Sequence, residues 1–340
     1  PLLLALLAGC FQTAQIYTAQ HNYYQARYDD AVSRLSGDEI PKRDALLALL
    51  EKGMALQAAG RYEESAGAWR EAETLMEKQD VFHAGEQALS LLFDQNILTY
   101  QPAPYEKPFL HGLLCLDYLI LNDVNSARVE ALKALKDLDE REKVVGPIAF
   151  ARYAAALAFE AAGDMDDAEI EYRKIRESGV ELGASDAKGI PLILFLGRSP
   201  RKVASEVVLD DEYRIVLPVF QAQSNTLTGA RIVTETDTPQ DAILLTSVET
   251  LASRFSGRLF AGELLKEVLR RKAQKHLVNK VGDKVGSTTE KLLKTILFFA
   301  GEADLRSWTS LPASVRLLRA EPSDSGALPA VSYTGESRHT

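Results

Sequence analysis

Apolar and small residues in the first half of the chain recur at the spacing of an amphipathic helix. Residues 49–72 show this most clearly, because one apolar run ends at Gly60 and a second begins at Tyr62. Gly60 suits a left-handed turn between two helices. Gly53 would let the second helix approach closely, and Trp69 lies on the packing face of that helix. The pattern predicts two packed helices joined by a tight turn.

Two later stretches repeat this pattern. The turn falls at Asn122 within residues 111–134 and at Gly163 within residues 152–175. Asparagine is a common substitute for glycine in a left-handed turn. The residues expected to pack the helices or form the turn in these stretches are Tyr118, Ala127, Ala156, Gly163, Ala168 and Tyr172.

These matches resemble the tetratricopeptide repeat, a helix–turn–helix unit of about 34 residues. A weaker half-motif lies at residues 28–32, but the spacing between matches is irregular and the closing proline is absent. An additional helix is expected at residues 83–98, before a proline-rich turn at residues 101–108. The resemblance implies an irregular helical solenoid.

The pattern changes after residues 183–189, a polar linker rich in small residues. Short runs of Val, Ile and Leu bounded by breakers then predict strands, and three longer stretches predict helices. The expected strands cover residues 190–196, 204–209, 213–221, 228–236 and 314–320, and the expected helices cover residues 241–255, 261–281 and 288–300.

Together these patterns predict a mostly α fold with two domains. A tetratricopeptide-like helical-hairpin solenoid is expected at residues 10–182, followed by a smaller α+β domain at residues 190–335. The net charge of −9 argues against a nucleic-acid-binding protein, which would carry a basic domain or stripe. No segment after residue 10 is apolar for long enough to cross a bilayer.

Residues 1–9 are apolar and end in small residues directly before Cys10. Such a run is too short to span a membrane but is typical of the end of a signal peptide. The alternative is an apolar helix with a buried free cysteine. Leu7-Ala-Gly-Cys10 resembles the lipobox of bacterial lipoproteins, which implies cleavage before Cys10 and a lipid anchor on its thiol. The only other cysteine, Cys115, is then expected to be an unpaired small hydrophobe.

The whole chain resembles a poorly characterised family of bacterial lipoproteins that join helical repeats to a C-terminal α+β region. The lipobox and two further stretches carry the resemblance, namely Glu106-Lys-Pro-Phe-Leu110 with Leu116-Asp-Tyr-Leu119 and Asn125-Ser-Ala-Arg-Val-Glu130, and Ala303-Asp-Leu-Arg-Ser-Trp308-Thr-Ser-Leu-Pro312. Phe11, which replaces the Asp found after the lipobox of inner-membrane lipoproteins, implies the outer membrane. The family has no established activity, so the resemblance implies architecture and location only.

The sequence contains no local pattern of catalytic residues. The five histidines are scattered, and neither a His-x-x-x-His nor a Cys-x-x-Cys pair occurs, so we expect no metal and no cofactor. Gly-x-Ser-x-Gly and the phosphate-binding glycine loop are also absent. The acidic clusters are expected to lie in the first turns of helices, where they complement the helix dipole.

Two groups of residues could contact a partner. Arg270, Arg271 and Lys275 lie in a basic stretch that is either a solvated helix face or a contact for anionic headgroups or an acidic protein. Arg306 and Trp308 flank the approach to a Pro-terminated loop, where they either pack a domain corner or anchor an interface.

Two functions from different classes remain open. The first is a non-enzymatic scaffold or assembly factor, held at the outer membrane by the lipid on Cys10, facing the periplasm and binding unidentified envelope proteins without a small-molecule substrate. The second is a protein that binds or processes peptidoglycan or polysaccharide, with its site in the α+β domain. That site would need paired carboxylates or aromatic platforms, and its first candidates are Asp210, Asp211, Glu212 and Trp308.

Overall fold

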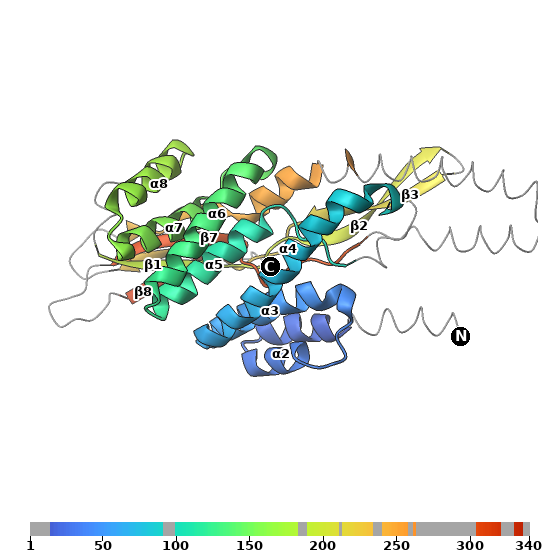
Figure 1. Ribbon diagram of the computed structural model, residues 1–340, viewed down its shortest axis with the longest axis horizontal. Coiled ribbons are helices and arrows are strands. Elements are labelled where there is room, and N and C mark those ends of the chain that lie inside the picture. Colours follow the sequence, from blue (N-terminus) through green and yellow to red (C-terminus); the bar gives the residue numbers. More distant parts are fainter. Residues whose placement is uncertain are drawn as a thin grey trace, which may run out of the picture.

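A computed structural model describes residues 14–90, 99–182, 189–210, 213–233, 240–257, 261–262, 304–320 and 330–335. The chain is mostly helical with a small region of antiparallel sheet, as predicted (Figure 1). None of the described helices combines the length and apolarity needed to cross a bilayer.

The described part of the first half of the chain is almost entirely helical. A helix at residues 14–24 precedes the others. The helices that follow it are α2 (Tyr28–Leu35), the 3-10 turn η1 (Lys42–Asp44), α3 (Ala45–Ala58), α4 (Tyr62–Ser90), α5 (Glu106–Ile120), α6 (Val124–Val145), α7 (Ala149–Ala162) and α8 (Met165–Glu177). The region therefore contains three helical hairpins, α3–α4, α5–α6 and α7–α8.

Left-handed residues form the turns within these hairpins. The φ angles are +74° at Gly60, +59° at Asn122 and +83° at Gly163. Asp123 then begins α6, because its side chain accepts a hydrogen bond of 3.1 Å from the amide of Ser126.

The first hairpin packs through a glycine against a tryptophan. A Cβ at Gly53 would lie 1.9 Å from Nε1 of Trp69, so only a glycine fits there. Ser65 donates a 3.0 Å hydrogen bond to the carbonyl of Gly53, and this bond joins α3 to α4 at the same level.

Gly53→Val is therefore expected to lower the free energy of unfolding by about 1–3 kcal/mol through overpacking against Trp69. Gly67→Ala on α4 is the matched control, since a Cβ there would meet nothing within 4 Å. Alanine is the better helix former, so the control should gain about 0.5–1 kcal/mol. Urea denaturation measures both changes, and a loss of similar size in both variants would contradict the packing argument.

The strands form three antiparallel sheets. They are β1 (Ile190–Leu196), β2 (Arg201–Asp210), β3 (Tyr213–Gln221), β4 (Leu227–Val233), β5 (Gln240–Asp241), β6 (Ile243–Ser247), β7 (Ser314–Ala320) and β8 (Ala330–Gly335). The orders within the sheets are β1-β7-β6, β2-β3 and β5-β4-β8. The most C-terminal strands thus pair with strands from the beginning of this half.

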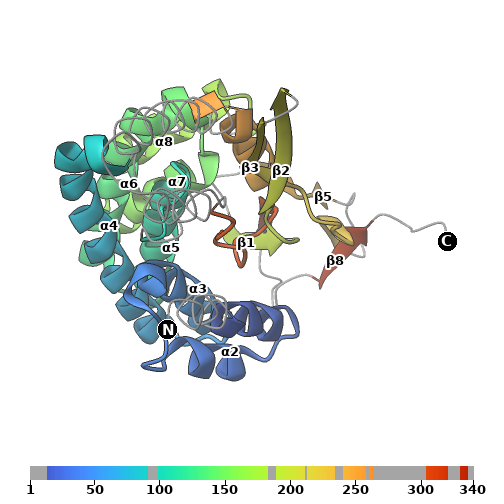
Figure 2. The same ribbon diagram turned by 90° about the vertical axis from the view of Figure 1, so that its right-hand side faces the viewer.

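The helices curve around the strands. Figure 2 shows α4, α6 and α8 on the outside of the curve, α5 and α7 inside it, and β1, β2 and β3 on its open side. The main hydrophobic core is continuous between the two halves, because it includes Trp69 and Phe150 from the helices together with Leu245, Trp308 and Val315.

Two predicted elements differ from the structure. Residues 241–255 do not form one helix: β5 and β6 occupy the first part, and a helix starts only at residue 248. Pairing of β6 with β7 outweighs the local helical spacing there. The extra helix expected at residues 83–98 does not begin as a new helix, because residues 83–90 are the end of α4. Of the helix expected at residues 261–281 only residues 261–262 are described, and they are helical; the rest of it and the helix expected at residues 288–300 lie outside the described residues.

Candidate functional site

The inner face of the helical half is covered by the chain itself. Residues 304–313, which we call the covering segment, precede β7 and lie against the helix at residues 14–24 and against α3. The strands continue the cover along α5 and α7 (Figure 2).

Glu51 of α3 holds the middle of the covering segment. Its carboxylate accepts hydrogen bonds from the amides of Thr309 at 2.8 Å and Ser310 at 3.3 Å, and from the side chain of Gln20 at 2.7 Å. Burial raises the pKa of Glu51, while these donors act to lower it. Tyr24 donates its hydroxyl to the carbonyl of Thr309, so the segment is bound through its backbone.

Arg306 holds the start of the covering segment. Its guanidinium donates to Asp304 at 2.8 Å and to the buried carboxylate of Asp44 at 2.7 Å. Burial opposes the charge, but the two carboxylates outweigh it and raise the pKa of Arg306. Because Asp44 directly precedes α3, this ion pair ties the segment to the first hairpin.

Trp308 fills the core between the covering segment and the helices. Its side chain is 1% exposed, and its indole donates a 3.1 Å hydrogen bond to Ser310. Arg306 and Trp308 thus pack an internal corner, which is one of the two roles considered for them. A buried indole also offers no platform for a sugar ring.

The strands cover the helices farther along. The amide of Phe150 on α7 donates to Thr246 of β6 at 2.9 Å, and its ring meets Phe195 of β1 edge-on. The ring of Tyr105, next to α5, stacks at a tilt on Phe220 of β3. Intramolecular contacts therefore cover the inner face both at α3, through the covering segment, and at α5 and α7, through the strands.

Glu106 is an ionisable group buried at this closed face. Its carboxylate accepts hydrogen bonds of 2.8 and 3.0 Å from the hydroxyl of Tyr100. Burial raises the pKa of Glu106 to about 8, although Tyr100 and the nearby charge of Lys202 act to lower it. Deprotonation would place a negative charge in the core.

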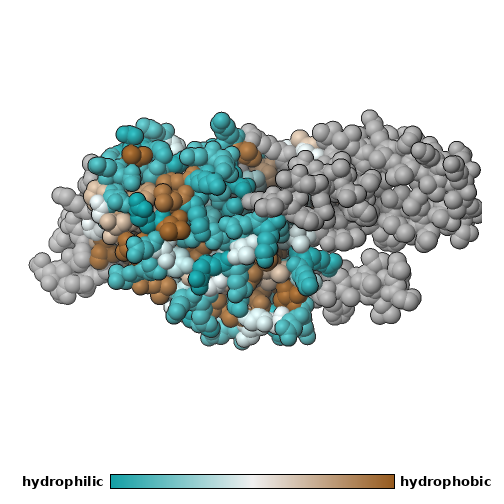
Figure 3. All heavy atoms as spheres, in the orientation of Figure 1, coloured by the Kyte–Doolittle hydropathy of each residue, from teal (hydrophilic) through white to brown (hydrophobic). Residues whose placement is uncertain are grey.

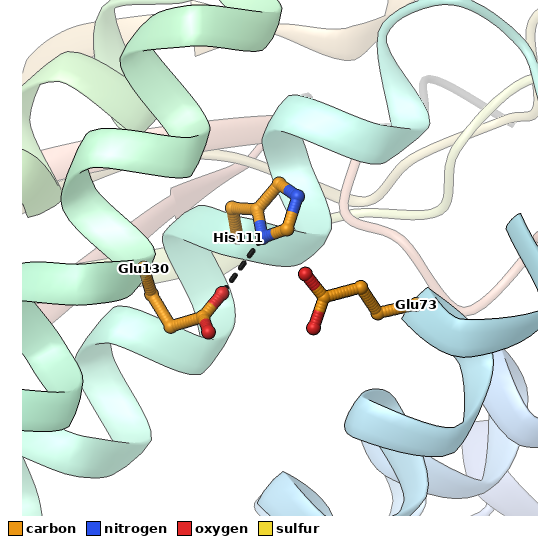
Figure 4. A group of neighbouring side chains, drawn as sticks. All are labelled: Glu73, His111 and Glu130. Atoms are coloured by element: carbon orange, nitrogen blue, oxygen red, sulfur yellow. Dashed lines mark hydrogen bonds and ion pairs between the residues drawn. The ribbon is translucent and has the colours of Figure 1, made fainter. Parts of the chain in front are cut away.

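A second cluster of charged groups lies between α4, α5 and α6. Glu73, His111 and Glu130 each come from a different helix, and Figure 4 shows their functional groups converging. One potential ligand atom from each residue lies within 4.8 Å of the others, and all three residues are buried. This is the group of described residues that could hold a metal ion.

We call Glu73, His111 and Glu130 the histidine cluster, and further charged side chains surround it. Nδ1 of His111 lies 2.7 Å from Glu130, and Nε2 lies 3.3 Å from Asp137. Lys133 bridges the remaining carboxylates, at 2.6 Å from Glu73 and 3.0 Å from Glu130. Burial opposes protonation, but Asp137 and Glu130 outweigh it and raise the pKa of His111.

The residues predicted to pack the repeats lie in and around the helical hairpins. Gly60 and Gly163 are exposed in turns, whereas Tyr62 and Tyr118 are half-buried. The buried members are Gly53, Trp69, Ala127, Ala156, Ala168 and Tyr172. Cys115 is also buried and donates its thiol to the carbonyl of Ala154 at 3.1 Å.

Several predicted site residues cannot be placed. Cys10, Arg270, Arg271 and Lys275 lie outside the described residues, as do Asp211 and Glu212. Asp210 ends β2, and nothing is described for its side chain. The structure therefore brings together none of the carboxylates considered for polysaccharide chemistry within its described part.

Comparison with known proteins adds little to this geometry. No protein-family model matches the chain, and no curated protein matches it. Among solved structures, the chain is similar to one titled MamA MSR-1 C2, with 15% identity and a TM-score of 0.21. The match covers 49% of this chain and 96% of that one. A TM-score this low supports no argument about fold or function.

Proposed function

We propose that the protein is a bacterial envelope lipoprotein that acts as a protein-interaction scaffold or assembly factor. In this proposal a lipid on Cys10 holds it at the outer membrane, facing the periplasm, and its partners are envelope proteins. It acts by binding and not by catalysis, and needs no cofactor.

The observation that carries the proposal is the exposed apolar surface of the outer helices. Val129 and Leu132 lie three residues apart on α6 and are 51% and 49% exposed. Met165 at the start of α8 is 59% exposed. Figure 3 shows brown apolar atoms among hydrophilic ones over these helices.

An ion pair links the beginnings of the two helices that carry these side chains. Nε of Arg128 on α6 lies 2.6 Å from the carboxylate of Asp164, the residue directly before α8. We call Val129, Leu132 and Met165 the outer patch. Apolar side chains grouped on a surface favour contact with another protein.

The covered inner face also favours the outer patch as the contact. Helical-repeat proteins commonly bind peptides in the concave groove, but Thr309, Trp308 and β6 fill that space here. A partner would have to displace these buried contacts to enter, whereas the outer patch is already accessible. For location, the support remains the lipobox sequence that ends at Cys10.

The proposal is tested by site-specific photocrosslinking in intact bacteria. A photoreactive amino acid at Leu132 is expected to capture a specific envelope protein, and the same label at exposed Thr74 on α4 is the matched control. Capture should require the anchor, so Cys10→Ser should abolish it and move the protein out of the membrane fraction.

Two results would count against this proposal. Equal capture from Leu132 and Thr74 would mean that the outer patch has no specific partner. Normal acylation and membrane recovery of the Cys10→Ser protein would remove the proposed anchor. Trp308 is buried and therefore cannot serve as the aromatic platform that the polysaccharide alternative would need.

A further inference from the structure

The geometry points to the histidine cluster as a binding site for one divalent transition-metal ion, with Zn²⁺ as the best-fitting ion. Glu73, His111 and Glu130 would be its ligands. This inference goes beyond the proposed scaffold function and does not depend on it.

The donor atoms suit such an ion. Imidazole nitrogen and carboxylate oxygen are both ligands that zinc accepts, with bonds of about 2.0–2.2 Å. The available atoms already lie within 4.8 Å of one another, on three packed helices. The ion would draw these oxygens together through rotation about the side-chain bonds of the two glutamates.

Asp137 supplies the outer contact that metal-bound histidines need. When Nδ1 of His111 binds the ion, Nε2 carries the proton and faces the Asp137 carboxylate, which lies 3.3 Å away. A carboxylate in this position orients the ring and increases its basicity as a ligand. The side chain of Asp137 is buried, so this contact is protected from water.

Lys133 occupies the place of a cation between the two glutamates. Its ammonium contacts Glu73 at 2.6 Å and Glu130 at 3.0 Å, so one positive charge faces two negative ones. A divalent ion would balance both carboxylates. The Lys133 side chain is 39% exposed and can swing into solvent, which opens a path for the ion.

The test uses the full chain with Cys10→Ser and without a polyhistidine tag. Calorimetric titration with ZnCl₂ measures stoichiometry and Kd, and Co²⁺ absorption reports the coordination geometry. His111→Gln removes a ligand, Lys133→Met removes the competing cation, and His21→Gln alters an exposed histidine outside the cluster.

We expect one Zn²⁺ per chain. His111→Gln should weaken binding by about a hundredfold or more. Lys133→Met should tighten it by about tenfold, because a like charge no longer opposes the ion. His21→Gln should leave Kd unchanged.

The inference is overturned if neither the parent chain nor Lys133→Met binds Zn²⁺, or if His111→Gln binds as tightly as the parent. If His111→Gln does not fold, the sign of the Lys133→Met effect decides. Tighter binding supports the site, and unchanged or weaker binding contradicts it.

Discussion

Trp308→Ala is expected to lower the free energy of unfolding by about 3–5 kcal/mol. The indole is fully buried between the covering segment and the helices, so truncation removes its apolar burial and leaves a cavity. The substitution also removes the 3.1 Å hydrogen bond from the indole to the buried hydroxyl of Ser310. Urea denaturation followed by far-ultraviolet circular dichroism measures the loss and reports whether the helices unfold with the segment.

Tyr333→Ala is the matched control for this substitution. Tyr333 is an aromatic residue of the same half, on β8, but it is 54% exposed. The change there should stay within about 0.5 kcal/mol. Helices that melt at the parental midpoint in Trp308→Ala would show that the covering segment does not stabilise them.

Glu106→Gln is expected to remove a large part of the pH dependence of stability. The pKa of Glu106 in the folded chain is about 8, against an ordinary value of 4.5. The folded state therefore binds the proton more tightly, and stability is lost as the pH rises between these values. At about 1.4 kcal/mol per pKa unit, the loss is on the order of 5 kcal/mol.

The measurement compares urea denaturation of the parent and Glu106→Gln at mildly acid and at alkaline pH. The free energy of unfolding of the variant should rise relative to that of the parent as the pH rises. Glutamine accepts the hydrogen bond from Tyr100 but does not titrate. Glu64→Gln is the control, because that carboxylate is exposed and Arg61 lowers its pKa. If the free energies of unfolding of the parent and Glu106→Gln differed by a constant amount across the pH range, the raised pKa of Glu106 would be refuted.

Much of the fold follows from local sequence. Gly60 and Gly163 stand at turns because their backbone adopts positive φ, and runs such as residues 213–221 form strands over their whole length. Residues 241–255 show the limit of this reasoning. Their apolar spacing suits a helix, but Ile243 and Leu244 pair with β7, more than 70 residues later in the chain.

The candidate sites were much less predictable. His111 and Glu130 are 19 residues apart on different helices, and Glu73 comes from a third helix, so no short metal motif exists. Their proximity results from helix packing, which periodicity alone does not specify. Glu51 is similarly uninformative in sequence, because its partners at Thr309 and Ser310 are brought to it only by the tertiary fold.

The contact between Glu51 and the covering segment can form only late in synthesis of the chain. The two residues that it joins are separated by 258 positions, and such distant contacts are costly in loop-closure entropy and slow to form. The helices emerge first from the ribosome, with their inner apolar side chains still uncovered. Until Trp308 arrives, the nascent chain is a substrate for chaperones and proteases, and a premature stop codon before this segment would leave it in that state permanently.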